Sequence, residues 1–224
     1  MRLIITIIII INHGDISLNV EAINKHIYTL CMCCSTVSIK HPLKYKLIKL
    51  AMSGVPLETI KGLLRLTVKR GIGLAVRDVT TSDPYIVVWH GDQKVRTAAV
   101  EKSVNPVWDE ELTLYATEPI EPLKLKVYDS DMFFDDTMGD AEVDITPFME
   151  SVTNNEEPMV DGTVIAKVIP GRENCLIEES EIIWKDRKVT QNMCLRLRNV
   201  ECGEIELMMQ WIEVNAMRRT TTYP

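Results

Sequence analysis

The segment YDSDMFFDDTMGD, residues 128–140, gathers carboxylates that could hold a cation, since five of its thirteen positions are aspartate. A second acidic segment, GLAVRDVTTSDPY, contains Asp78 and Asp83. Carboxylates that lie close together repel and raise one another's pKa, and a hard divalent cation cancels this repulsion. Calcium takes about 6–8 oxygen ligands in flexible geometry, whereas magnesium prefers a rigid octahedron with retained waters. The two acidic segments therefore indicate calcium.

An EF-hand and a purely structural role are two alternatives for these aspartates. An EF-hand is excluded, because its loop requires Gly at the sixth position and Glu at the twelfth, and counting from Asp129 gives Phe134 and Asp140 there. Aspartate also occurs in turns for purely structural reasons. For Asp83 alone, before Pro84, that structural interpretation is favoured. A DSD triplet closely followed by DD, with a second acidic segment, favours a cation site instead.

The elements that must position these segments are strands, because the surrounding sequence alternates between apolar and polar residues. The alternation is clear in LLRLTVKR (63–70), LKLKVYD (123–129) and EIELMMQW (204–211). Such alternation is typical of strands buried on one face, as in antiparallel sheets. Turn signals such as SDP, HGD and MGD separate the strands. The pattern predicts an all-β sandwich in which both acidic segments are loops and can meet at one end.

Residues 150–192 interrupt this alternation of apolar and polar residues with polar, turn-rich sequence. Within them, GRENCLIEESE is compatible with a loop or a short helix, and IIWKDRKV predicts a hairpin that turns at Lys185–Lys188. MCLRLRNV then predicts a strand with Leu195 and Leu197 on one face. We interpret the whole stretch as an insertion before the last strand, packed on the same domain.

Several motifs together resemble known proteins. A close resemblance to the C2 domain, an eight-stranded antiparallel Greek-key β-sandwich that binds calcium and phospholipid, is carried by SDPYIVV, NPVWDEELTL and VYDSDMFFDDTMGD. A resemblance to the plant C2-domain abscisic-acid-related family is carried by GLLRLTVKRG, MGDAEVDITPF and ENCLIEESEIIWKDRKVTQNMCLRLRNVECGEIELMMQW. That family consists of small single-C2 proteins with a signature insertion before the final strand. The resemblance covers residues 53–213, with the insertion at about 150–192 and a C-terminal tail at 214–224.

The resemblance implies an adaptor rather than an enzyme. In the family, calcium bridges loop aspartates and anionic lipid head groups, and the proteins bring abscisic-acid receptors to the plasma membrane, with the insertion implicated in that contact. The expected role is positive regulation of abscisic-acid signalling. The expected locations are the cytoplasmic face of the plasma membrane, the cytosol and the nucleus. Family members are also described as GTPase activators, so a GTPase is an alternative partner, and a calcium-independent protein-interaction module is a third hypothesis.

The family motif also implies the calcium ligands. Its first-loop and third-loop ligands match, in chain order, Asp78, Asp83, Asp129, Asp131 and Asp136. The third loop is one residue shorter than is usual in the family, so either Asp135 or Asp136 supplies the last ligand. Asp136 is preferred because its distance from Gly139 is preserved. The shorter loop also leaves open a weaker second calcium site.

Apolar and basic residues near the loops suggest how the protein meets a membrane. Phe133 and Phe134 lie at the expected tip of the third loop, where aromatic rings enter the lipid interface. The alternative is that one of the two rings packs back on the sandwich. A candidate basic sheet face for phosphoinositides consists of Lys94, Arg96, Lys124 and Lys126. Alternating lysines on a strand are also common on an ordinary solvated surface.

Composition argues against several classes of protein. The chain has 224 residues and a net charge of −7. Residues 1–51 contain six basic and two acidic residues, so the rest of the chain carries −11, which argues against nucleic-acid binding. The six cysteines form no Cys/His ligand quartet and suggest no disulfide framework, so a reducing compartment fits best. His90 is the sole histidine of the predicted domain, and no nucleophile elbow, P-loop or HExxH motif appears.

Two further features bear on function less directly. Arg196 or Arg198 could serve a GTPase activator, although arginines that alternate along a strand are usually solvated. The apolar run LIITIIIII is shorter than the roughly 20 residues of a membrane-spanning helix, and isoleucine favours strand or aggregation. We interpret residues 1–51 as poorly ordered, or as an extension upstream of a start at Met52. The alternative is membrane attachment through CMCC and KHPLKYKLIK.

Overall fold

The computed structural model describes residues 6–12, 15–21, 60–77, 81–154, 159–171 and 174–213. The chain divides into two compact units, Met1–Val55 with Met217–Pro224, and Pro56–Ala216. In the first unit, strands β1 (Thr6–Asn12) and β2 (Asp15–Glu21) pair as an antiparallel hairpin. The predictions for the other residues of 1–51 and for the 214–224 tail lie outside the described residues.

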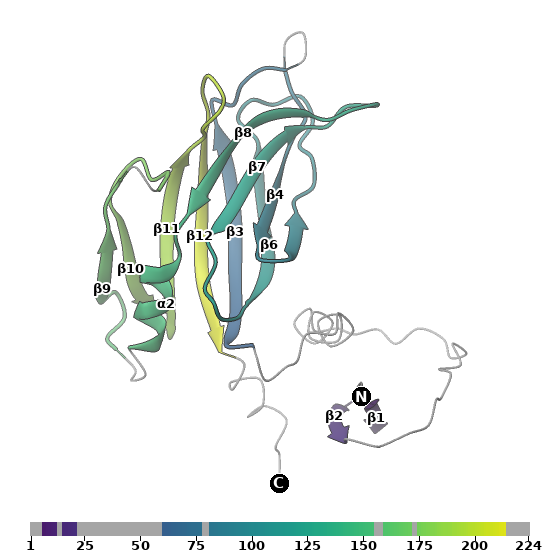
Figure 1. Ribbon diagram of the computed structural model, residues 1–224, viewed down its shortest axis with the longest axis vertical. Helices are drawn as coiled ribbons and strands as arrows, with labels where there is room; N and C mark the ends of the chain where they lie inside the picture. The colour runs from purple at the N-terminus through teal and green to yellow at the C-terminus, as the bar shows by residue number, and fades with distance from the viewer. Residues whose placement is uncertain are drawn as a thin grey trace, which may run out of the picture. The chain divides into compact units, whose positions relative to one another are not determined.

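The second unit is a β-sandwich of two antiparallel sheets (Figure 1). The four-stranded sheet has the order β5-β4-β7-β8, and the six-stranded sheet has the order β6-β3-β12-β11-β10-β9. The strands are β3 (Gly62–Ile72), β4 (Pro84–His90), β5 (Gln93–Arg96), β6 (Val107–Ala116), β7 (Leu123–Asp129), β8 (Asp136–Val143), β9 (Val164–Val168), β10 (Ser180–Lys185), β11 (Lys188–Arg196) and β12 (Glu204–Glu213). The all-β sandwich is confirmed.

The alternating sequence builds the core because β3, β7 and β12 turn their apolar residues to the opposite sheet. In β12, Ile205, Leu207, Met209 and Trp211 are buried, and the residues between them are half-buried. β3 and β7 follow the same alternation. Burying one such aliphatic or aromatic side chain contributes about 1.5–3 kcal/mol, so the repeated pattern fixes which face of these three strands points inward.

The insertion adds strands to the sandwich, which therefore has ten strands rather than the expected eight. β9 and β10 extend the six-stranded sheet beyond β11. β10 and β11 form the predicted hairpin, whose turn residues Asp186 and Arg187 both have positive φ, as the type I′ hairpin turn requires. The arm after this turn and the strand predicted from MCLRLRNV are one strand, β11. In GRENCLIEESE, the described residues before β10 form no helix.

A short helix, α2 (Thr146–Thr153), follows β8 and was not predicted. It buries Phe148 and Met149 and has a proline in its first turn, a position that proline tolerates. Eight residues are too few to show a helical period in the sequence. Among the described residues, no helix is both long and apolar enough to span a membrane.

Strand register brings the two acidic loops to one end of the sandwich, as the strand pattern suggested. Pro84, which opens β4, pairs with Asp129 at the end of β7, and Asp129 pairs with Asp136 at the start of β8. The described residues that precede β4 (73–77 and 81–83) therefore adjoin the loop between β7 and β8 (residues 130–135). We call them the first and third loops. In Figure 1 the β7–β8 hairpin projects from this end of the domain.

Candidate functional site

Asp129 is the buried centre of the acidic end. Its side chain has no exposed surface, because the alternation of β7 turns it inward. One carboxylate oxygen, Oδ1, accepts a hydrogen bond from the backbone N–H of Asp83 at 2.5 Å. The other oxygen, Oδ2, has no hydrogen-bond partner among the described residues. A buried carboxylate oxygen without a partner is unfavourable by several kcal/mol unless a cation or a donor satisfies it.

Asp83 ties the first loop to its surroundings through both backbone and side chain. Its carboxylate Oδ1 accepts from the backbone N–H of Lys102 at 2.7 Å, and its carbonyl accepts from the N–H of Ser130 at 3.1 Å. Together with its own N–H bond to Asp129, these contacts hold Asp83 beside the end of β7. Asp83 therefore joins the first loop to Asp129 at the end of β7 and to Ser130 in the third loop.

In the third loop, Asp135 and Asp136 have different surroundings. Asp135 accepts a hydrogen bond from the Tyr85 hydroxyl at 2.6 Å and another from the backbone N–H of Asp131 at 3.1 Å. Asp136 is exposed and stands opposite Asp129 in the β7–β8 pairing. Because both oxygens of Asp135 already accept donors of the protein, Asp136 is the better candidate for the last ligand.

The described residues fit a hard cation only in part. Asp83, Asp129 and Asp136 follow one another across the end of the four-stranded sheet, and the unpartnered oxygen of Asp129 is the strongest sign of a cation site. No three Asp, Glu, His or Cys side chains within the described ranges converge in the manner of a finished metal centre. Asp78, a predicted ligand, lies outside the described residues. Oxygen donors alone are the ligand set that calcium prefers.

Arg77 fastens the first loop to two other segments. Its Nε donates to the carbonyl of Thr137 at 3.0 Å, and Nη1 and Nη2 donate to the two carboxylate oxygens of Glu201 at 2.8 and 3.0 Å. The side-chain hydrogen bond from Arg77 lowers the pKa of Glu201 to about 2, and the same bond raises the pKa of Arg77. Sequence reasoning did not identify this ion pair, because its partners are 124 positions apart.

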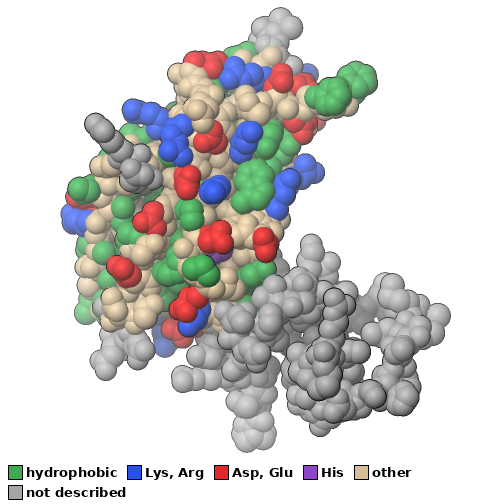
Figure 2. All heavy atoms as spheres, in the orientation of Figure 1, with side chains coloured by type: hydrophobic (Ala, Val, Ile, Leu, Met, Phe, Trp, Pro, Cys, Tyr) green, Lys and Arg blue, Asp and Glu red, His purple; other side chains and the backbone are tan. Residues whose placement is uncertain are grey.

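The tip of the third loop is apolar and exposed. Met132, Phe133 and Phe134 expose 90%, 83% and 86% of their surface, and green side chains project at the tip of the β7–β8 hairpin in Figure 2. The alternative in which one phenylalanine packs against the sandwich is therefore wrong. Val76 in the first loop is also exposed. Sequence reasoning missed Met132, which stands between two residues that it selected, and Val76, which is two positions before Asp78.

The four predicted basic residues lie on one face of the four-stranded sheet together with aromatic rings. Lys94, Arg96 and Lys124 are exposed and Lys126 is half-buried. In the pairing across β5, β4 and β7, Arg96 and Lys126 flank Val87, and Lys94 and Lys124 flank Trp89. Blue side chains lie to both sides of a green group over this sheet in Figure 2. We call this the basic-aromatic face.

Aromatic rings support the cations of the basic-aromatic face. Arg96 lies over the Tyr85 ring at 5.4 Å, Lys126 over Tyr128 at 5.2 Å and Lys94 over Trp89 at 5.5 Å from the ring centroid. The Tyr85 and Tyr128 rings stack with centroids 5.5 Å apart. Cation–π contacts hold charged side chains in place without neutralising them, so the face stays available to an anionic group. Lys94 and Arg96 of β5 reach rings of β4, so the sequence did not reveal these two pairs, whereas Lys126 and Tyr128 are two positions apart in β7.

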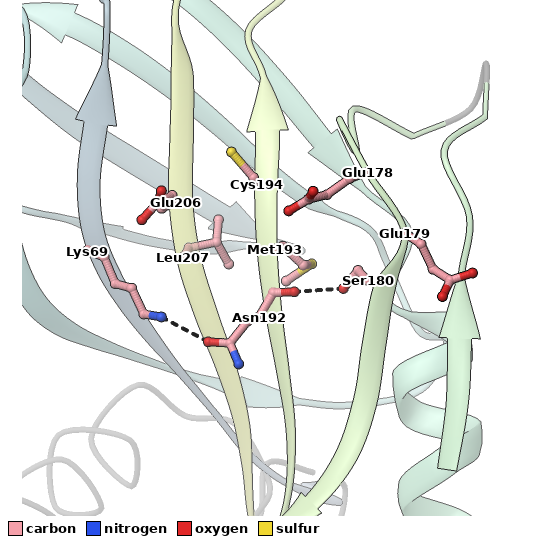
Figure 3. A pocket seen from close by; sticks show the side chains of 9 residues that line it. All are labelled: Lys69, Glu178, Glu179, Ser180, Asn192, Met193, Cys194, Glu206 and Leu207. Atoms are coloured by element: carbon pink, nitrogen blue, oxygen red, sulfur yellow. Dashed lines mark hydrogen bonds between the residues drawn. The ribbon is translucent and has the colours of Figure 1, made fainter. Parts of the chain in front are cut away.

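A shallow hollow of about 180 Å³ lies elsewhere, on the six-stranded sheet (Figure 3). It is lined by Lys69, Glu178, Glu179, Ser180, Asn192, Met193, Cys194, Glu206 and Leu207. Lys69 Nζ donates to Asn192 Oδ1 at 2.9 Å, and Ser180 Oγ donates to the carbonyl of Asn192 at 2.8 Å. Burial raises the pKa of the Cys194 thiol, which disfavours a reactive thiolate. None of the predicted site residues lines this hollow.

The residues considered above for a catalytic or GTPase-activating role are His90, Arg196 and Arg198. His90 ends β4 and is buried, and burial lowers its pKa. Arg196 and Arg198 are exposed, and Arg198 Nη2 lies 3.7 Å from Glu142 Oε2. None of these three residues is among those that line the hollow in Figure 3.

Comparisons with known proteins relate this chain to a family. A profile of the C2 domain matches residues 62–159. GTPase activating protein 1 from Oryza sativa subsp. indica is 51% identical over 153 residues, covering 68% of this chain and 93% of that protein. Protein C2-DOMAIN ABA-RELATED 1 from Arabidopsis thaliana is 49% identical over 166 residues, covering 72% of this chain and 99% of that protein. A solved C2 domain of plant Extended Synaptotagmin 1 has a TM-score of 0.46 at 17% identity, covering 69% and 96% of the two chains.

Proposed function

Because this chain belongs to the C2-domain ABA-related family, we propose that it is a calcium-dependent phospholipid-binding adaptor. In this proposal it recruits abscisic-acid receptors to the cytoplasmic face of the plasma membrane and positively regulates abscisic-acid signalling, with further pools in the cytosol and the nucleus. The protein acts as a regulator without a catalytic centre of its own. The observation that carries the calcium dependence is the buried Asp129, whose Oδ2 has no partner among the described residues.

The proposed ligands are Asp78, Asp83, Asp129, Asp131 and Asp136. Asp129 supplies a buried oxygen, Asp83 is held beside it by the N–H bond, and Asp136 stands across the strand pair. Bound calcium supplies the positive charge that turns this end of the domain from repelling an anionic membrane to attracting it. Asp135 acts as a structural acceptor for Tyr85 and the third-loop backbone.

Membrane contact is proposed for the tip of the third loop and the basic-aromatic face. Phe133 and Phe134 enter the lipid interface, with Met132 beside them, because these side chains are almost fully exposed next to the acidic end. Lys94, Arg96, Lys124 and Lys126 attract phosphoinositide head groups to the sheet. Apolar insertion and electrostatic attraction together give stable attachment where either alone is marginal.

The receptor-binding surface is proposed to be the insertion at the outer edge of the six-stranded sheet. β9 forms the edge of that sheet and β10 lies next to it. Three apolar residues of the insertion, Val160, Val164 and Ile169, expose 81%, 42% and 67% of their surface. Exposed apolar residues gathered in one segment are typical of interaction sites.

A vesicle co-sedimentation experiment tests the calcium switch. The full chain is mixed with phosphatidylserine-containing vesicles in calcium or in chelator, and with phosphatidylcholine vesicles as a control. We expect sedimentation only with anionic vesicles and calcium, and we expect the joint change of Asp129→Ala and Asp131→Ala to abolish it. Equal sedimentation in chelator would leave the calcium-independent interaction module as the better hypothesis.

A second candidate function is stimulation of a GTPase, which the name of the 51% identical rice protein favours. Arg196 is exposed on β11 and is the arginine proposed to act there. The test is single-turnover GTP hydrolysis by a purified GTPase. The rate is measured alone, with the wild-type chain and with the Arg196→Ala variant. GTPase stimulation would be established as a separate activity if Arg196→Ala removed it and kept calcium-dependent vesicle binding.

A further inference from the structure

Arg77 has two acidic neighbours at the same end of the domain. Its guanidinium makes a bidentate pair with Glu201, which lies in the connection between β11 and β12. It also interacts electrostatically with Asp136, whose neighbour Thr137 accepts the Nε hydrogen bond of Arg77 at 3.0 Å. Among the described residues, the ion pair of Arg77 within 4.0 Å is the one with Glu201. Asp136 is left exposed beside it.

A hydrogen bond to a buried serine holds the backbone of Arg77 in this place. Its N–H donates to the hydroxyl oxygen of Ser82 at 2.9 Å, and Ser82 is fully buried and donates in turn to the carbonyl of Ala75. The root of the arginine side chain is therefore fixed within the first loop. A guanidinium freed from Glu201 would remain close to Asp136, and the opposite charge would draw it there.

We propose that Glu201 keeps the Arg77 guanidinium off the carboxylate of Asp136, and so keeps that carboxylate available to calcium. A guanidinium paired with Asp136 competes with the metal for the same oxygens, whereas the bidentate pair with Glu201 uses both Nη atoms of the arginine. Glu201 is thus a positioning residue that acts on the cation site through Arg77 without touching the metal. This inference rests on the proposed function, because it assigns Asp136 to the calcium site.

A double-mutant cycle on calcium affinity tests the proposal. Calcium is titrated by calorimetry, without lipid, into the wild-type chain, Arg77→Gln, Glu201→Gln and the double variant. We expect Glu201→Gln to weaken calcium binding about tenfold, in line with the strength of a charged hydrogen bond. Arg77→Gln should change little in the wild-type background, where the arginine is already held away, and should restore most of the affinity in the Glu201→Gln background.

Two controls separate this competition from a general charge effect. Glu204→Gln removes the same charge a few residues away, and we expect it to change calcium affinity less than about twofold, as is usual for screened surface charges. In metal-free protein, the carboxyl carbon resonance of Asp136 should shift in Glu201→Gln, because a new ion pair forms, but not in Glu204→Gln.

The outcomes discriminate between the two proposals. If Arg77→Gln strengthens calcium binding equally in both backgrounds, the charges act additively and the competition is refuted. If the Asp136 resonance is unmoved in Glu201→Gln, the competition is refuted as well. A wild-type chain that gives no calcium binding overturns the proposed calcium dependence, and this inference with it.

Discussion

The hydroxyl of Tyr85 donates a hydrogen bond of 2.6 Å to the carboxylate of Asp135. Tyr85 belongs to β4, and its ring carries Arg96 on the basic-aromatic face and stacks on Tyr128. Asp135 belongs to the third loop and also accepts the N–H of Asp131. One hydrogen bond therefore joins the sheet face proposed for phosphoinositides to the loop proposed for calcium and membrane contact.

Replacing Tyr85 with Phe removes this bond and keeps the ring. We expect the free energy of unfolding to fall by about 1 kcal/mol, the usual net contribution of one hydrogen bond. Urea denaturation measures it. Amide hydrogen exchange at Asp131 should also become faster, because the acceptor that orders its N–H is released. Tyr128→Phe, which retains the stacked ring, serves as the control, and an equal loss in both variants would contradict the role of the hydroxyl.

The same tyrosine predicts a dependence of stability on alkaline pH. Burial and the hydrogen bond to Asp135 raise the pKa of Tyr85 from 10.0 to about 12. The folded protein therefore keeps this proton at a pH where the unfolded chain loses it, so the stabilisation from Tyr85 is full below pH 10.0 and declines as pH rises towards about 12. The difference in unfolding free energy between wild type and Tyr85→Phe should shrink between pH 9 and pH 11.5 (roughly the window that the linkage relation sets). A difference in unfolding free energy that stays constant over this pH range would contradict the raised pKa of Tyr85.

Asp129→Asn tests the buried carboxylate. Its side-chain oxygen can still accept from the N–H of Asp83, so we expect the melting temperature in chelator to be preserved. Calcium at a hundredfold excess over its dissociation constant stabilises a binding protein by about 2.7 kcal/mol, and this gain should vanish in the variant. Thermal unfolding with and without calcium measures both quantities. Asp92→Asn, in the exposed turn after β4, should keep the full calcium gain.

Phe133→Ala and Phe134→Ala should weaken calcium-dependent binding to anionic vesicles. A fully buried ring contributes about 1.5–3 kcal/mol, and partial entry into the interface predicts a loss of about tenfold for each variant. Vesicle titration followed by light scattering measures the affinity, while calcium binding without lipid should stay unchanged. Ile169→Ala, an exposed apolar residue of the insertion, is the matched control. If it weakens binding as much, the third-loop tip is not the site of insertion.

Arg96→Gln combined with Lys126→Gln should reduce binding to vesicles that contain a phosphoinositide. Each basic residue near an anionic surface contributes about 1 kcal/mol, so the pair predicts a loss of about 30-fold at low salt. The loss should diminish at high salt because the attraction is screened, whereas the loss from Phe133→Ala should persist. Lys185→Gln, exposed at the turn of the insertion hairpin, is the control, and a loss independent of salt would argue against an electrostatic contact.

The sequence predicted the sandwich because its strands alternate so regularly. Continuing the alternation of Leu125 and Val127 by one step places Asp129 inward, so even the burial of this residue was accessible to pattern reasoning. Asp131, two positions farther along, lies beyond the end of β7 and is exposed. The same DSD triplet thus contains one buried and one exposed carboxylate.

Contacts between distant segments could not be predicted in the same way. The choice between Asp135 and Asp136 depends on the Tyr85 hydroxyl, which reaches Asp135 from another strand. The pair of Arg77 and Glu201 depends on how two loops meet at the end of the sandwich. The extra strand β9 has only five residues and pairs with β10 through a register shift, so its alternation is too short to identify it, whereas β10 was predicted as an arm of the hairpin.

β11 belongs at once to the insertion hairpin and to the C2 sandwich. Its first residues pair with β10, and most of its length pairs with β12 in the centre of the six-stranded sheet. Trp184 of β10 packs against the buried core. The insertion and the sandwich therefore share one strand and one hydrophobic core. Its exposed side chains can therefore be substituted without disturbing the core, but the strands beneath those side chains must fold and unfold together with the rest of the sandwich.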